Sequence, residues 1–148
     1  MIDTRLPHKE LSAGLVVLHH DGERLRLLCL RTFEDWDFPK APAADEGEAL
    51  DAAIAGTRAA TGLEDLEFPW GEDHRDTVAF DDGRVSRYFL AESKSSDVVL
   101  RLPADADAEE DYGYAWVTFD DAEDLLPPRL ALVLDWALRR VSTPAKSF

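Results

Sequence analysis

The stretch from Phe38 to Leu63, FPKAPAADEGEALDAAIAGTRAATGL, is the part of this chain that says most about its fold. It passes through a short acidic loop, Glu46-Gly47-Glu48, into a run rich in alanine. This run predicts a helix from about Glu48 to Ala60, because apolar residues recur there at the spacing of one helix face. Gly62 is well placed to end the helix, since glycine readily adopts the left-handed conformation found there. The residues expected to face the core are Leu50, Ala53, Ile54 and Thr57.

Two antiparallel strands are predicted before this helix. Residues Ser12 to His20 form an apolar run that is typical of a buried strand. Asp21-Gly22 is a hairpin turn signal, and Leu25 to Thr32 should return alongside the first strand.

Further strands and two helices are predicted after it. Asp73 to Phe80 and Arg84 to Glu92 flank Asp81-Asp82-Gly83, a second hairpin signal. Asp97 to Leu102 and Tyr114 to Thr118 are expected to be short strands. A helix should begin near Asp120 and lead to Leu125-Leu126, and Leu130 to Val141 should form the last amphipathic helix. Its core face would carry Leu130, Val133, Leu134, Ala137 and Val141.

Composition restricts the partners. The formal charge of -15 on 148 residues disfavours binding to nucleic acid or to an anionic membrane, because both require a basic surface. The single cysteine, Cys29, stands in an apolar run and is expected to be a buried small hydrophobe. Neither a signal peptide nor a membrane span is recognisable, and we expect a cytoplasmic protein.

The central stretch resembles the Nudix box, G-x5-E-x7-R-E-U-x-E-E-x-G-U, in which U is a bulky apolar residue. Counting back from Gly62 without a gap, the frame of the box is kept but its charged residues are replaced. The box glycine falls on Ala41, its first glutamate on Gly47, its Arg-Glu pair on Ala55 and Gly56, and its paired glutamates on Ala59 and Ala60. A divalent cation needs hard oxygen ligands, which alanine and glycine side chains lack.

The resemblance extends from about Ser12 to Leu138 and is closest to the diadenosine tetraphosphate hydrolase branch of the Nudix family. The segments that carry it are Ser12-Ala13-Gly14, Asp35-Trp36-Asp37-Phe38-Pro39-Lys40, Arg87-Tyr88-Phe89-Leu90-Ala91-Glu92 and the acidic loop from Glu110 to Trp116. It implies one α/β domain over residues 1–142, an α/β/α sandwich with a mixed sheet. Residues 143–148 are expected to form a flexible tail.

The resemblance also implies where a ligand would bind. Lys40 matches a basic residue next to the box that can meet a phosphate. Arg84, Arg87 and Tyr88 match the region that meets polyphosphate and base. Tyr112 lies where a nucleobase could stack on an aromatic ring.

A rebuilt metal site would have to use other acids. Glu46, Glu48 and Asp51 are close in sequence, and Glu110 could assist from the later acidic loop. Glu48 and Asp51 lie three residues apart on the predicted helix and are the candidate ligands for Mg²⁺. Otherwise no metal cofactor is expected.

Three hypotheses follow. The first is a Nudix-fold protein that binds a nucleotide or dinucleoside polyphosphate but lacks the metal-binding glutamates and is catalytically impaired. The second is an active Mg²⁺-dependent pyrophosphohydrolase that uses the non-standard acids. The third is a regulatory scaffold that binds a protein partner through its acidic surface.

Overall fold

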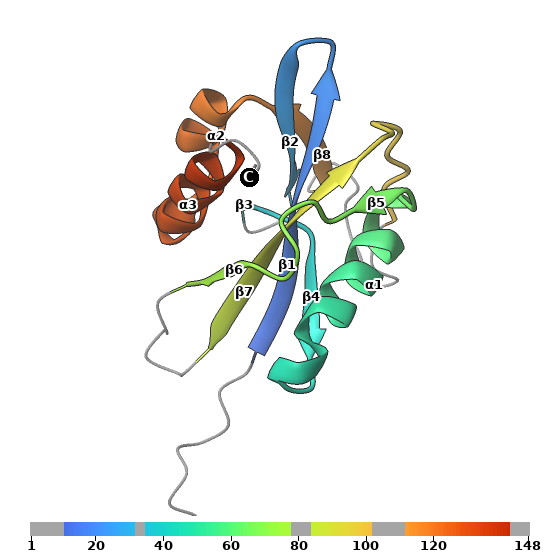
Figure 1. Ribbon diagram of the computed structural model, residues 1–148, viewed down its shortest axis with the longest axis vertical. Helices are drawn as coiled ribbons and strands as arrows, with labels where there is room; N and C mark the ends of the chain where they lie inside the picture. Colours follow the sequence, from blue (N-terminus) through green and yellow to red (C-terminus); the bar gives the residue numbers. More distant parts are fainter. Residues whose placement is uncertain (1–10, 32–34, 78–83, 102–111, 143–148) are drawn as a thin grey trace, which may run out of the picture.

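A computed structural model describes residues 11–31, 35–77, 84–101 and 112–142 (Figure 1). The expected hairpin tip at Asp81-Asp82-Gly83, the candidate acid Glu110 and the tail 143–148 lie outside these residues. The strands are β1 (Leu11–Asp21), β2 (Arg24–Arg31), β3 (Trp36–Asp37), β4 (Lys40–Ala43), β5 (Leu66–Glu67), β6 (His74–Asp76), β7 (Val85–Ser93) and β8 (Gly113–Val117). The helices are α1 (Ala49–Thr61), α2 (Phe119–Leu125) and α3 (Ala131–Ser142), with short 3-10 turns η1 (Glu46–Glu48) and η3 (Pro128–Leu130).

The sheet is mixed, as predicted. β1 and β2 form the expected antiparallel hairpin, with Asp21 opposite Arg24. β1 runs parallel to β7, whereas β4 pairs antiparallel with the first half of β1. β6 and β5 pair antiparallel with β7, and β8 pairs antiparallel with β2. The 11-residue β1 is therefore the central strand that joins both halves of the sheet.

Helices cover both faces of the sheet (Figure 1). α1 packs on one face, where Ala13, Leu15 and Val17 of β1 meet Ala49 and Ala53. On the other face, α2 and α3 cover Val16, Leu18 and the facing residues of β2 and β7. The strict alternation along β1 places odd-numbered residues under α1 and even-numbered ones under α3. The predicted α/β/α sandwich is confirmed.

The helix predictions hold with small shifts. α1 ends at Gly62, which has a φ of 75° and donates its N–H to the carbonyl of Arg58. Its fully buried residues are Ala49, Ala53, Thr57 and Thr61, while Leu50 and Ile54 are half-buried. The predicted core face of the last helix is confirmed. Leu130 at the end of η3 is buried, as are Val133, Leu134 and Ala137 of α3, and Val141 is half-buried.

One strand prediction was wrong. Residues Asp97 to Arg101 form no strand. The Val99 N–H instead donates to the carbonyl of Thr61 at 2.9 Å, and the Arg101 N–H donates to that of Ala60 at 3.0 Å. These donors satisfy carbonyls at the end of α1 that have no partner within the helix. A short apolar segment can therefore be used to cap a helix instead of joining a sheet.

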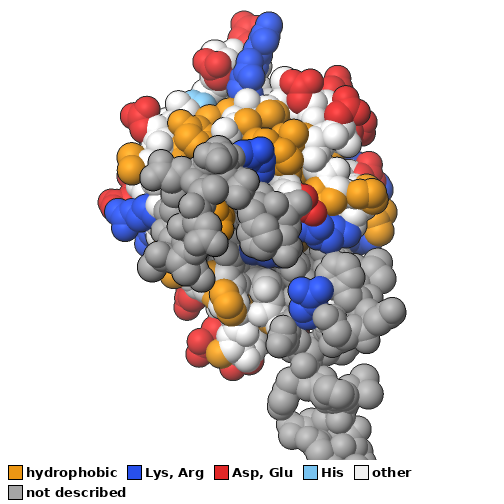
Figure 2. Space-filling view, turned by 180° about the vertical axis from the view of Figure 1, so that it is seen from behind, with side chains coloured by type: hydrophobic (Ala, Val, Ile, Leu, Met, Phe, Trp, Pro, Cys, Tyr) orange, Lys and Arg blue, Asp and Glu red, His pale blue; other side chains and the backbone are white. Residues whose placement is uncertain are grey.

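Figure 2 shows the molecule from behind relative to Figure 1. Charged side chains are spread over this face, and Asp and Glu side chains are prominent along its upper edge. None of the helices in the described ranges has the length and apolarity required to span a membrane. Cys29 is completely buried, as predicted, and burial raises the pKa of its thiol to about 12.

Candidate functional site

The positions of the box glutamates lie on α1 and on the turn before it. Gly56 faces β4 at close range: a Cβ built on Gly56 would lie 2.6 Å from the Cβ of Ala41. Real Cβ atoms do not approach so closely, so this helix position has no room for any side chain. Ala59 is exposed and Ala60 half-buried. Positions 56, 59 and 60 of α1 therefore carry no side-chain oxygen that could bind a metal ion.

The described residues near the start of α1 include few carboxylates that a divalent metal ion could use. Among the described residues, no group of three or more His, Cys, Asp or Glu side chains is placed to hold one. The exposed Glu48 and Asp51 lie at the start of α1, and Glu48 is the N-cap residue without a side-chain capping bond. A Mg²⁺ ion bound through two carboxylates takes its remaining ligands from water and substrate phosphates, and no described residue adds a third carboxylate here. We therefore derive no metal-dependent step from these residues.

A hollow of about 610 Å³ opens beside the N-terminal end of α1. Its walls are formed by Leu11, Ala44, Asp45, Glu46, Gly47, Asp76, Val85 and Arg87. It thus lies between the turn that precedes the helix and the start of β7, and it includes the box position Gly47. Its size falls within the range of small-molecule binding sites.

Among the residues that the structure describes, Arg87 is the one cation on the wall of this hollow. Its side chain is only 13% exposed. Its Nε donates to Oδ1 of Asp76 at 2.8 Å, and its Nη2 donates to Oδ2 at 3.0 Å. Nη2 also lies 3.4 Å from Oε1 of Glu46, whose side chain is 78% exposed. Asp76 therefore fixes the guanidinium, whereas Glu46 contacts it weakly from solvent.

The pKa of Arg87 is raised above its ordinary value, chiefly by the hydrogen bond with Asp76. The guanidinium remains charged at every pH at which the protein would be folded. The hollow therefore has a permanent cation, held from one side by Asp76 and contacted from the other by the exposed carboxylate of Glu46.

A second charged cluster lies on the opposite face of the sheet, around Asp37. This carboxylate is buried and accepts hydrogen bonds from the hydroxyl of Tyr88 at 2.7 Å and from the N–H of Phe38 at 2.6 Å. Its other oxygen lies 3.0 Å from Nζ of Lys40 and 3.0 Å from Nη2 of Arg129. Arg129 also pairs with Asp35 at 3.1 Å. The cluster ties the segment before β4 to η3 and to β7.

The structure places the candidate ligand-binding residues on both faces of the sheet. Tyr88 is fully buried, and burial followed by the charge of Asp37 raises the pKa of its hydroxyl. It pairs with Gly14 of β1, as does Lys40, whereas Arg87 pairs with the neighbouring Ala13. Lys40 and Arg87 therefore lie on opposite faces of the sheet and do not line the same pocket.

The other two expected binding residues lie elsewhere. Arg84 is exposed just before β7. Tyr112 is half-buried before β8, which pairs with β2 and is therefore separated from β7 by two strands. Of the described residues that were proposed from the sequence, only Glu46 and Arg87 line the hollow.

Sequence reasoning missed Asp76, Asp37 and Arg129. Asp37 had a detectable signal, because an acid between the large aromatic residues Trp36 and Phe38 is a candidate for burial and would then need partners. Asp76 and Arg129 had none, because their partners are 11 and 92 residues away along the chain.

Comparison with solved structures defines the class of fold. An Ap4A hydrolase from C. elegans, in a binary complex, superposes with a TM-score of 0.74 at 19% identity, over 90% of this chain and 98% of that one. The Nudix hydrolase RenU from M. smegmatis gives 0.63 at 21% identity, over 95% and 89%. The Nudix domain of Shewanella oneidensis NrtR, complexed with ADP ribose, gives 0.67 at 13% identity, over 96% and 94%.

This chain has the Nudix fold. No protein-family model matches the sequence, and no curated protein matches it significantly. At these identities the likeness is one of fold, and the expectation drawn from the box is confirmed at that level.

Proposed function

We propose that this Nudix-fold protein binds a nucleoside phosphate beside α1 and does not hydrolyse it by metal-dependent Nudix chemistry. The observation that carries the proposal is the contact between Gly56 and Ala41, where a Cβ would lie at 2.6 Å. A glutamate at this helix position would require β4 to move away. The lack of a carboxylate at position 56 is thus part of how the helix packs, which supports a protein adapted to binding.

Arg87 is the group proposed to meet the phosphate. It is held rigidly by Asp76, and a guanidinium suits planar recognition of phosphate oxygens. The wall also carries Asp45, Glu46 and Asp76, which would repel an anion. We infer that Glu46 swings away when the phosphate arrives, because its 3.4 Å contact with Arg87 is exposed and weak.

Ligand titration tests whether the protein binds a nucleotide. The wild-type protein is titrated with ADP-ribose, ATP and diadenosine tetraphosphate, with and without Mg²⁺, and the melting temperature and calorimetric Kd are measured. A ligand at 100 times its Kd should stabilise the protein by about 2.7 kcal/mol. An unchanged melting temperature for every ligand would defeat the proposal.

Three variants test the site itself. Arg87→Gln should weaken binding about tenfold or more, since a hydrogen bond to a charged group contributes about 1.5–3 kcal/mol. Glu46→Gln should strengthen binding by up to about fivefold, because it removes the competing carboxylate. Glu48→Gln makes the same change of charge two residues away and should have little effect.

The active-enzyme alternative predicts a different pattern. If Glu46, Glu48 and Asp51 hold Mg²⁺ for hydrolysis, Glu46→Gln and Glu48→Gln should both lower the rate. A chelator should then abolish nucleotide turnover. Turnover that needs Mg²⁺ and falls in both variants would favour the enzyme over the binding protein.

A further inference from the structure

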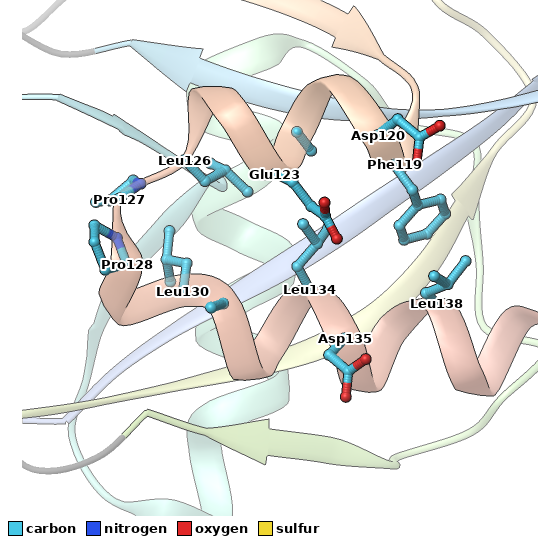
Figure 3. Close-up of a pocket in the computed structure, with 12 residues that line it drawn as sticks. Phe119, Asp120, Glu123, Leu126, Pro127, Pro128, Leu130, Leu134, Asp135 and Leu138 are labelled. Carbon is cyan, nitrogen blue, oxygen red and sulfur yellow. The ribbon is translucent and has the colours of Figure 1, made fainter.

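A groove of about 340 Å³ runs between α2 and α3, on the face of the sheet opposite α1 (Figure 3). It begins at Phe119 and continues past Leu126 and the Pro127-Pro128 turn, which joins the two helices. The floor is apolar: Leu130, Leu134 and Leu126 are buried, while Leu138 remains 40% exposed at one end. Phe119 is half-buried and faces the same space (Figure 3). A bulky apolar side chain could therefore be desolvated here.

Carboxylate side chains line the rim of the groove. Asp120 and Glu123 come from α2, and Asp135 comes from α3 (Figure 3). Asp135 pairs with Arg139 one turn along the helix, with the Nε at 3.1 Å. Within the described part of the chain, Asp120 and Glu123 are exposed and have no ion-pair partner, and no lysine or arginine lines the groove.

The apolar floor and the unpaired acids on the rim of the groove indicate which kind of ligand is complementary to it. The carboxylates repel phosphates, so a nucleotide does not fit. A second copy of this chain, with a formal charge of -15, is also repelled. The complementary occupant carries bulky apolar side chains on one side and lysine or arginine beside them. An amphipathic helix lying in a groove meets this description.

We propose that the α2–α3 groove docks a basic amphipathic helical segment of another protein. Its apolar residues cover Phe119 and Leu138, and its cations meet Asp120 and Glu123. The groove lies on the opposite side of the sheet from the hollow at Arg87, so this proposal is independent of nucleotide binding. The acidic surface then has a specific role at this groove beyond keeping the protein soluble.

The probe is a labelled synthetic peptide of about 14 residues, or four helical turns, with leucines on one face and lysines on the other. Fluorescence anisotropy with the full-length protein measures its binding. A control peptide keeps the leucines and replaces each lysine by glutamate. We expect saturable binding of the lysine peptide, weakened by salt, and no binding of the glutamate peptide.

Matched control variants are available for both the apolar contact and the charge contact of the proposed peptide site. Leu138→Ser removes the exposed apolar end of the groove, and Leu132→Ser makes the same change on α3 at a residue that is 50% exposed and outside the groove. Glu123→Gln removes a rim charge, and Asp124→Asn removes the neighbouring charge on α2, which does not line the groove. The two groove variants should each weaken binding by up to about fivefold, and the two controls should not.

Equal weakening by the groove variants and their controls would show that the peptide binds the acidic surface without a site and would overturn the proposal. Binding of the glutamate peptide, or no binding of either peptide, would also overturn it. Circular dichroism and melting of each variant confirm that all four are folded, since the substituted residues are exposed.

Discussion

Gly56 of α1 and Ala41 of β4 share a space that holds only one Cβ. The Nudix box, aligned from Gly62, has glycine at position 41 and glutamate at position 56, whereas this chain has alanine at 41 and glycine at 56. Relative to that pattern, the smaller of the two residues stands on the helix and not on the strand. Glycine at position 56 allows α1 to pack closely on β4 and provides no carboxylate there.

The first prediction tests this coupling. Gly56→Ala should destabilise the protein by about 1–2 kcal/mol, because overpacking costs more than the gain in helix propensity of about 1 kcal/mol. In the Ala41→Gly background the same substitution should become neutral or stabilising. Chemical denaturation of the four proteins gives the coupling energy, and additive effects would contradict the shared contact.

Ala55→Gly is the matched control for propensity. Ala55 is exposed on the same helix, so glycine there should cost about 1 kcal/mol in either background.

The second prediction restores the box. Combining Ala41→Gly with glutamate at positions 47, 56, 59 and 60 should give at least tenfold tighter Mn²⁺ binding by calorimetry than wild type, about 1.4 kcal/mol. Without Ala41→Gly, the same glutamates should lower the melting temperature, because a glutamate introduced at position 56 would clash with Ala41. A variant with glutamine at the four positions has the same shape and should bind no more metal than wild type. Equal metal binding by both sets would contradict the prediction.

The third prediction concerns the buried carboxylate of Asp37. Asp37→Asn should cost about 2–3 kcal/mol of unfolding free energy, since Lys40 and Arg129 would lose a partner whose side chain is only 11% exposed. This is less than for a fully buried pair, because those two cations are themselves 34% and 31% exposed.

The matched control is Asp35→Asn. Asp35 also pairs with Arg129 but is 42% exposed, so its loss should cost less than about 1 kcal/mol. Similar losses in the two variants, measured by urea unfolding, would show that burial of Asp37 is unimportant.

The fourth prediction is a loss of stability at alkaline pH. Burial raises the pKa of Cys29 from 9.0 to about 12, so the unfolded chain releases this proton first. The contribution of Cys29 is fully present below about pH 9 and falls as the pH rises towards 12, by about 1.4 kcal/mol per pH unit. The buried hydroxyl of Tyr88 adds a loss of the same sign at higher pH.

Cys29→Ala isolates the cysteine. The variant should be less stable at neutral pH because of the lost packing, yet its unfolding free energy should fall less steeply than wild type from about pH 9. Tyr88 is present in both proteins, so its contribution to the pH dependence of the unfolding free energy cancels in the comparison. Parallel curves would rule out the linkage.

Local pattern was enough to predict most of the fold. The run from Ser12 to His20, the Asp21-Gly22 turn and the alanine-rich helix ending at Gly62 each form because neighbouring residues share one preference. The failure at Asp97 to Arg101 has a non-local cause, since the free carbonyls at the end of α1 take the N–H groups that a strand would use. The periodicity of residue types along the chain does not show that the carbonyls of α1 compete for these N–H groups.

Residue type and spacing, which are local properties, were sufficient to predict the β1–β2 hairpin, β7, β8 and the three helices, whereas the two-sided sheet was implied by the family resemblance. Which charges meet depends on how the elements pack in three dimensions. Packing placed Lys40 and Arg87 on opposite faces of the sheet, paired Arg87 with Asp76, and brought Gly56 against Ala41. Each of these contacts depends on strand register, in which a shift of one residue exchanges the two faces.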